Sequence, residues 1–401
     1  MGNRREFIQK SSLVTLGLTG IGKINLNQQT KSLKEIRNSL GLKKGLVYMN
    51  TGSLGPSPLW ISQKEFDLSR ELELNPVSNN WGPLGKRMEE VRSKAAAFLN
   101  CSSSEIVLTR NTTEGLNMVS STLDLNPGDE ILTTNNEHGG GENGIIYAAK
   151  QSGANIIKVE LPMPAKNKEE VIEKILKAIT DKTKVLLLSH VATIEGMQMP
   201  LEEISNFIKG QGIFFIADGA QSAGMLQIDV KKLGVDAFAT SGHKWLMGPK
   251  ETGLLYVKES SKERIKPVFT LSGFQSYSAS SGTRNVMHHI AFGDMIDWHM
   301  ESDRGIIQSN ALNLGQYCYE KLLPIKNIRI ISPQIKSLRT ALISFELQSS
   351  TNKDLYNYLK SKDIIVKVLP KYNAVRLSNH IFNTEGDVDK TIKEIDNFLN
   401  H

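Results

Sequence analysis

The chain has 401 residues, which is long enough for roughly two or three domains and a large buried core. Hydrophobic residues make up 39% and charged residues 22%, values that argue against a disordered or fibrous chain. The 48 basic and 42 acidic residues leave a net charge of +6 that is dispersed along the chain, so no nucleic-acid partner is expected. The two cysteines, Cys101 and Cys318, form no metal-binding motif, so no metal is expected, and whether they pair stays open.

The first residues are typical of an export signal. Two adjacent arginines, Arg4 and Arg5, precede a mildly apolar stretch over residues 11–22 that is too short to span a bilayer. This pattern resembles a twin-arginine signal and predicts a periplasmic or exported protein, with residues 1–25 as the signal and no clear cleavage site. The alternative is a plain amphipathic first helix in a cytoplasmic protein.

After a polar linker, strand-like and helix-like segments alternate along the chain. Short apolar runs rich in β-branched residues predict strands at residues 104–109, 130–134, 155–161, 184–189, 213–218 and 235–240. Helical patterns between them cover residues 113–123, 139–151, 167–180 and 200–209. This alternation predicts βαβ units and a mostly parallel sheet in an α/β fold. We expect the large domain to cover residues 26–285.

From about residue 286 the pattern changes. Two long helices are predicted first, and mixed strands and helices follow. The predicted helices cover residues 286–301, 304–323, 352–361 and 386–399, and the predicted strands cover residues 328–332, 340–347, 364–368 and 373–377. We expect a smaller α/β domain over residues 286–401.

Residues 213–253 hold the densest chemical signal. Asp218 closes one predicted buried strand, and Lys244 follows the next predicted strand. Because residues just past the carboxyl ends of neighbouring parallel strands meet in one crevice, the two side chains can face the same ligand. A lysine there can form a Schiff base with a carbonyl cofactor, and a nearby carboxylate can hold a pyridinium nitrogen protonated. Ser241 and His243 flank the lysine and could donate to a phosphate.

With this combination, the chain resembles the class V aminotransferase family of fold-type I pyridoxal-phosphate enzymes. Within that family it is similar to the isopenicillin N epimerase-like group, with cysteine desulfurases as relatives. The resemblance runs from about residue 48 to residue 400. It implies a mostly parallel central sheet with helices on both faces and a smaller C-terminal domain. It also implies pyridoxal 5′-phosphate as cofactor, an amino-acid-type substrate and a homodimer with shared active sites.

The resemblance assigns roles to the residues already singled out. Lys244 matches the Schiff-base lysine, and Asp218 matches the partner of the pyridine nitrogen. Gln221, on a helix expected after Asp218, matches the residue that bonds the phenolic oxygen of the cofactor. Ser241 and His243 match phosphate ligands.

A second group of matches lies at two expected helix starts. Thr112 and Thr113 match the turn that cradles the cofactor phosphate, and a helix N-terminus with free N–H groups binds anions in any case. The alternative is that the two hydroxyls only cap the helix. His138 matches the ring that stacks on the cofactor. The three glycines that follow, Gly139–Gly141, replace bulkier residues common in the family and suggest a roomy or mobile site.

The remaining matches concern the substrate and the dimer. Thr193 stands where many relatives carry an asparagine that touches the cofactor ring. Thr283 matches a segment that relatives send across the dimer interface to the partner's phosphate, although an ordinary polar loop is the alternative. Arg376 matches the arginine that grips the α-carboxylate through two parallel hydrogen bonds, and a surface salt bridge is its alternative. Asn50 and Gly52 resemble the N-terminal substrate loop, where glycine permits a close backbone approach.

One family feature is missing. Cysteine desulfurases carry a nucleophilic cysteine upstream of the carboxylate-binding arginine, and the matching residues 364–373 contain none. We therefore expect an enzyme that acts at the α-carbon of an amino acid or an amino-acid-ended peptide, an epimerase or aminotransferase, with Lys244, Asp218 and His138 as catalytic residues. One alternative is a carbon–sulfur or β-elimination lyase of the same fold. The other is an exported cofactor- or ligand-binding protein without turnover.

Overall fold

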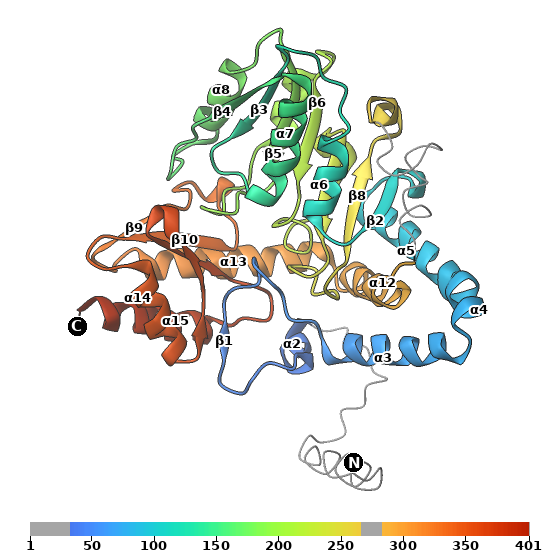
Figure 1. Ribbon diagram of the computed structural model, residues 1–401. Coiled ribbons are helices and arrows are strands. Elements are labelled where there is room, and N and C mark those ends of the chain that lie inside the picture. The colour runs from blue at the N-terminus through green and yellow to red at the C-terminus, as the bar shows by residue number, and fades with distance from the viewer. Residues whose placement is uncertain (1–32, 266–282, 401) are drawn as a thin grey trace, which may run out of the picture.

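The computed structural model describes residues 33–265 and 283–400, so the predicted signal lies outside the described residues. Figure 1 shows a large part built around a central sheet and, beside it, a C-terminal part coloured orange to red. The long helix α13 (Arg304–Leu322) takes part in the apolar cores of both parts. In the ranges that the structure describes, no helix has the length and apolar character needed to cross a membrane.

The central sheet has seven strands in the order β2-β8-β7-β6-β5-β3-β4. Their bounds are β2 (Ile106–Thr109), β3 (Glu130–Thr134), β4 (Asn155–Val159), β5 (Thr183–Ser189), β6 (Phe214–Asp218), β7 (Ala237–Ser241) and β8 (Gly253–Val257). Neighbouring strands are parallel except around β8, which runs antiparallel to both β2 and β7. The prediction of a mostly parallel α/β sheet is confirmed, and β8 is a strand that the sequence had not suggested.

Continuous apolar runs form the central strands because both faces of the sheet are covered. In β5, Val185 and Leu187 belong to the apolar core on one face, and Leu186 and Leu188 belong to the core on the other. Figure 1 shows α6 and α7 in front of the sheet, and residues of both helices belong to the same core as Val185. Burial on both sides leaves the strand ends as the places where polar side chains can gather.

In the described residues, the α-helices before α12 are α2 (Leu33–Ile36), α3 (Leu59–Leu74), α4 (Pro76–Trp81), α5 (Pro83–Leu99), α6 (Thr112–Ser120), α7 (Gly139–Ser152), α8 (Lys168–Lys177), α9 (Leu201–Ile208) and α10 (Val230–Leu233). The four helices predicted between the strands are present as α6 to α9. Helix α12 (Val286–Glu301) packs against α5 and α3. The proposed domain boundary after residue 285 therefore precedes a helix that contacts the large part, and the boundary stays a prediction.

The C-terminal part contains a four-stranded antiparallel sheet in the order β12-β13-β10-β9. Its strands are β9 (Ile328–Ile330), β10 (Leu342–Leu347), β12 (Lys367–Leu369) and β13 (Ala374–Ser378), and its helices are α14 (Asn352–Ser361) and α15 (Glu385–Asn400). The single strand predicted over residues 364–368 is divided into β11 (Ile364–Ile365) and β12. Strand β11 pairs with β1 (Val47–Tyr48) instead of joining the larger sheet.

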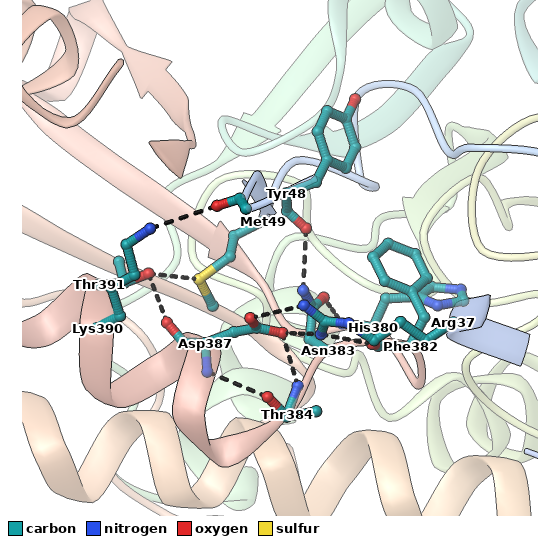
Figure 2. A network of polar contacts seen from close by, with 11 residues as sticks. Arg37, Tyr48, Met49, His380, Phe382, Asn383, Thr384, Asp387, Lys390 and Thr391 are labelled. Atoms are coloured by element: carbon teal, nitrogen blue, oxygen red, sulfur yellow. Dashed lines mark hydrogen bonds and ion pairs between the residues drawn. The ribbon is translucent and has the colours of Figure 1, made fainter. Parts of the chain in front are cut away.

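The N-terminal segment is tied to the beginning of α15, as Figure 2 shows. Arg37 donates hydrogen bonds to both carboxylate oxygens of Asp387. The side-chain amide of Asn383 donates to the carbonyl oxygen of Tyr48 over 3.1 Å. These contacts fix the start of the segment that leads from β1 to the Gly52 loop.

Candidate active site

A cavity of about 550 Å³ lies at the carboxyl ends of β5, β6 and β7, between the central sheet and the C-terminal part. All but two of the site residues predicted from the sequence line it: Gly52, Thr112, Thr113, His138, Thr193, Asp218, Gln221, Ser241, His243, Lys244 and Arg376. They come from distant parts of the chain because parallel strands bring their carboxyl ends to one edge of the sheet.

Lys244 and Asp218 lie together in this cavity. Burial lowers the pKa of Lys244 to about 8, against the opposing effect of Asp218, and Arg376 lowers it further. Burial raises the pKa of Asp218, and the charge of Lys244 opposes that shift. One carboxylate oxygen of Asp218 accepts a hydrogen bond from the Ala220 N–H over 2.8 Å, which fixes its orientation. The pair is thus an acid of fixed orientation beside an amine with a substantial neutral fraction near neutral pH.

The N-terminus of α6 forms an anion cradle. The Thr112 N–H donates to the Ser241 hydroxyl over 3.0 Å, and the two hydroxyl oxygens lie 2.7 Å apart. Asn111 caps the helix, and Thr113 also faces the cavity. The buried Nδ1 of His243 has no hydrogen-bond partner among the described residues, and burial lowers the pKa of His243 to about 4. A helix end, hydroxyls and a neutral imidazole can together bind a phosphate.

His138 caps helix α7, and its Nδ1 accepts a hydrogen bond from the Gly140 N–H over 3.1 Å. Burial lowers the pKa of His138, and Lys244 adds to this effect. A Cβ on Gly140 would lie 2.5 Å from the Thr113 hydroxyl, and a Cβ on Gly141 would lie 3.3 Å from a carboxylate oxygen of Asp218. These glycines bring α7 close to α6 and the cavity, so close packing accounts for them better than a roomy site does.

Arg376 is fully buried on β13, which excludes the alternative of a surface salt bridge. Its Nη1 donates to the carbonyl oxygen and the hydroxyl of Thr193 over 2.7 and 2.8 Å. Burial lowers the pKa of Arg376 to about 10, so the guanidinium remains charged at neutral pH. Its Nε has no partner among the described residues, so this cation keeps donors for a carboxylate. A Cβ on Gly52 would lie 2.7 Å from Nη2, which explains the glycine there.

Gln221 connects three walls of the cavity. Its Nε2 donates to the Gly52 carbonyl over 2.8 Å and to the Thr193 hydroxyl over 3.3 Å, and its Oε1 accepts from Trp245 Nε1 over 2.9 Å. Gln221 lies on a series of turns after β6, so the helix expected there is wrong. The Thr193 hydroxyl accepts from both Gln221 and Arg376. The cofactor contacts assigned to Thr193 and Gln221 stay predictions.

Two predicted residues do not line the cavity. Asn50 is half-buried, and its Oδ1 has no hydrogen-bond partner among the described residues. Thr283 is exposed just before α12 and does not line the cavity of its own chain. The predicted substrate role of Asn50 and the predicted phosphate contact of Thr283 in a dimer therefore stay predictions.

Several lining residues were missed from the sequence. Lys367, Val368, Leu369 and Pro370 form one wall, on β12 and the turn that follows it. This stretch had drawn attention only because it lacks a cysteine. No local signal indicates this wall, because Val366 lies between β11 and β12 and the place of Lys367 depends on the pairing of β12 with β13.

Glu137, outside the lining of the cavity, is another residue that the sequence did not reveal. Its two carboxylate oxygens accept hydrogen bonds from the Thr134 hydroxyl over 2.7 Å and from the Ser189 hydroxyl over 2.5 Å. Burial raises the pKa of Glu137 to about 7, although both hydroxyls favour the charged form. Because Glu137 precedes His138 and bonds the end of β5, this buried carboxyl helps to hold His138 beside the cavity.

Neither cysteine belongs to the site. Cys318 is buried in α13, Cys101 is half-buried after α5, and both are free thiols. Neither lines the cavity. In the described parts of the chain, no group of three or more His, Cys, Asp or Glu side chains could hold a metal ion.

Known proteins are similar to this chain in sequence and in fold. The family described as aminotransferase class-V matches residues 71–390, about four fifths of the chain. A probable cysteine desulfurase of Halalkalibacterium halodurans is 29% identical, with 88% of this chain and 92% of the relative covered. An isopenicillin N epimerase of Streptomyces clavuligerus is 22% identical, with coverages of 90% and 97%. The cystine C–S lyase C-DES, solved with its reaction product cysteine persulfide, has a TM-score of 0.81 at 21% identity, covering 88% of this chain and 98% of that one. A mutant of C-DES holds glycine covalently linked to its PLP cofactor. At these identities, the structural likeness shows the fold.

Proposed function

Because the chain belongs to the class V aminotransferase family, we propose that it is a pyridoxal 5′-phosphate enzyme that eliminates a group from the β-carbon of an amino acid. The observation that carries the proposal is the cavity in which Lys244, Asp218 and Arg376 meet beside the anion cradle of α6. Neither Cys101 nor Cys318 lines this cavity, so sulfur removed from a substrate would leave as a thiol or persulfide and would not pass to either cysteine.

The residues of the cavity fit the cofactor. The α6 cradle presents the hydroxyls of Thr112, Thr113 and Ser241 and the N-terminal end of the helix to a phosphate, and the Nδ1 of His243 has no partner among the described residues. Asp218, oriented by the Ala220 N–H, can accept a hydrogen bond from a protonated ring nitrogen. The lowered pKa of Lys244 makes its amine available to a carbonyl carbon. When bound, pyridoxal phosphate supplies an electron sink for the pair released at the α-carbon.

The side chains of the cavity have separate roles in the reaction. Arg376, held by Thr193, takes the substrate carboxylate and so directs the α-hydrogen toward Lys244. Lys244 removes the α-proton, and its pKa of about 8 suits a general base near neutral pH. The bond from the β-carbon to the leaving group breaks, and the leaving group departs with the electron pair. Water hydrolyses the resulting enamine to a keto acid and ammonia.

Two observations favour elimination over epimerisation. Of the two relatives described above, the probable cysteine desulfurase shares more identity with this chain than the epimerase does. The C–S lyase C-DES also has this fold. Epimerisation is the second candidate, because the isopenicillin N epimerase matches 90% of the chain and because residues 367–370 contain no cysteine.

A panel of amino acids tests this proposal. The purified, cofactor-loaded protein is incubated with cystine, S-substituted cysteines and amino acids without a leaving group. Keto acid, ammonia and the two enantiomers are then measured. We expect keto acid and ammonia in equal amounts from the β-substituted compounds alone. Inversion of the α-carbon without ammonia would replace the lyase by an epimerase, and a bound cofactor without any turnover would support a binding protein.

Homodimerisation and export belong to the proposal as well. The support for a dimer is the match of the Thr283 segment to one that relatives send across the dimer interface, together with the exposure of Thr283 outside its own cavity. The support for export is the pair Arg4 and Arg5 ahead of a short apolar stretch. A twin-arginine route would suit a protein that folds around its cofactor before export.

A further inference from the structure

One wall of the cavity presents a cation that the proposed chemistry does not use. Strand β12 pairs antiparallel with β13, and Lys367 lies directly opposite Arg376 in this register. Both residues line the cavity. Val366, which lies between β11 and β12, is buried in the C-terminal core, whereas Lys367 is exposed.

The charges that line the cavity do not balance. Lys244, Lys367 and Arg376 are cationic, and Asp218 is the one acidic side chain among the described lining residues. Burial and the charge of Arg376 lower the pKa of Lys367. The Lys367 ammonium makes no hydrogen bond and no ion pair with a residue that the structure describes. Lys367 is an exposed residue, so its ammonium faces the cavity from the open side.

The proposed function leaves this cation without a counter-ion. The cofactor phosphate belongs at the α6 cradle, Asp218 serves the ring nitrogen, and the substrate α-carboxylate compensates Arg376. None of these anions is assigned to Lys367. A substrate with a neutral side chain would cover the ammonium without pairing it, and an unpaired buried charge is costly.

On the basis of the proposed function, we propose that Lys367 binds an anionic group at the end of the substrate side chain. The enzyme then selects α-amino acids that carry a second acidic group, such as a carboxylate or a sulfonate. Val368, Leu369 and Pro370 line the same wall, where Lys367 and Pro370 are exposed and Val368 and Leu369 are half-buried. A substrate that fills the cavity would displace water from this wall, and the charge pair would then be stronger than in open solvent.

Two pairs of nearly isosteric ligands test the inference. Aspartate and asparagine differ only in the charge of the side chain, and so do S-carboxymethylcysteine and S-carbamoylmethylcysteine, which also carry a leaving group. Binding to the cofactor-loaded enzyme is measured by calorimetry, and elimination by keto-acid release. The wild-type enzyme should bind the acidic member of each pair at least about tenfold more tightly, as expected for a charge-assisted hydrogen bond.

Lys367→Met keeps the length of the side chain and removes its charge, so it should abolish most of this preference while the cofactor absorbance stays unchanged. Lys371→Met is the matched control, because Lys371 lies in the turn Pro370–Tyr372 and does not line the cavity. It should keep the full preference.

Equal binding within each pair, a preference that survives Lys367→Met, or an equal loss in Lys371→Met would each overturn the assignment. A different result would show that the proposed lyase function is wrong. If the binding preference depends on Lys367 but no keto acid forms from either cysteine derivative, the lyase is wrong and the acidic side-chain site stands. If none of the four amino acids binds, both proposals fall.

Discussion

The guanidinium of Arg376 is held on one side by Thr193 and offers its remaining donors to the cavity. Arg376→Lys keeps a charge but cannot serve Thr193 and a carboxylate together, because lysine lacks the planar fork. We expect a KM for every accepted amino acid that is higher by about 10- to 150-fold, as for the loss of a charge-assisted hydrogen bond, and an unchanged cofactor absorbance.

Arg329→Lys is the control for Arg376. Arg329 is an arginine near the surface that pairs with Glu346. An exposed ion pair contributes about 0–1 kcal/mol, so this variant should keep both stability and KM. A wild-type KM in Arg376→Lys across the whole panel would show that the α-carboxylate is bound elsewhere.

The buried carboxyl of Glu195 should make the stability of the protein depend on pH. It is completely buried, one oxygen accepts from Asn136 Nδ2 over 2.9 Å, and the other has no partner in the described parts of the chain. Burial raises its pKa from 4.5 to about 7. The folded protein therefore binds the proton more tightly than the unfolded chain does. This contribution to stability is fully present below pH 4.5 and is lost as the pH rises through 7.

Glu195→Gln cannot ionise and should escape this loss. As the pH rises from 4.5 through 7, the wild type should lose roughly 3 kcal/mol of its free energy of unfolding that Glu195→Gln keeps. Urea unfolding of both proteins at about pH 5 and about pH 8 measures the difference. Parallel changes in the two proteins would mean that Glu195 does not retain its proton in the folded state.

At the scale of elements, the packing of α7 on α6 shapes the anion cradle. Gly140→Ala places a Cβ 2.5 Å from the Thr113 hydroxyl, which must then rotate or shift away. We expect the affinity for pyridoxal phosphate to fall by up to about tenfold, the value of one neutral hydrogen bond, with a smaller effect on stability.

Gly139→Ala is a matched control for this prediction, because a Cβ there meets no atom within 4 Å. Alanine also has the higher helix propensity, so this variant should be neutral or slightly stabilising. Equal cofactor affinities in the two variants, measured by equilibrium titration, would mean that Thr113 does not contribute to the cradle.

The parallel strands could be predicted because each is a short apolar run bounded by polar residues, and the strand ends then place Asp218 and Lys244 in one crevice. Pairing between distant segments could not be predicted in the same way. Strand β11 pairs with β1 while β12 pairs with β13, so the apolar run around Val366 is divided between two sheets. Lys367 was missed for this reason: its place in the cavity depends on its register opposite Arg376.

The conformation of the turn that carries Gln221 could not be predicted from the sequence either. A helix was expected after Asp218, but the chain forms successive turns there. Gly219 lies so close to Phe238 that a Cβ would be 2.1 Å from its ring. This contact with β7 depends on tertiary packing, which no local pattern in residues 219–224 reveals.

For the whole molecule, the described residues contain both the cavity and the elements that form it, whereas the predicted signal lies outside them. Removal of residues 1–25 should therefore leave the cofactor absorbance and KM unchanged and abolish export. Cell fractionation of the full-length and shortened proteins, with absorbance spectra of both, checks this expectation. A shortened protein that cannot bind the cofactor would show that these residues belong to the fold.

The central claim for the whole molecule is that the cavity between its two parts holds a cofactor attached to Lys244. Borohydride reduction of the purified protein, followed by mass spectrometry of its peptides, tests this claim most directly. We expect the reduced cofactor on the peptide that contains Lys244, and no covalent adduct anywhere in Lys244→Ala, in which the cradle still permits loose binding. An adduct on another lysine, or one that persists in Lys244→Ala, would contradict the assignment.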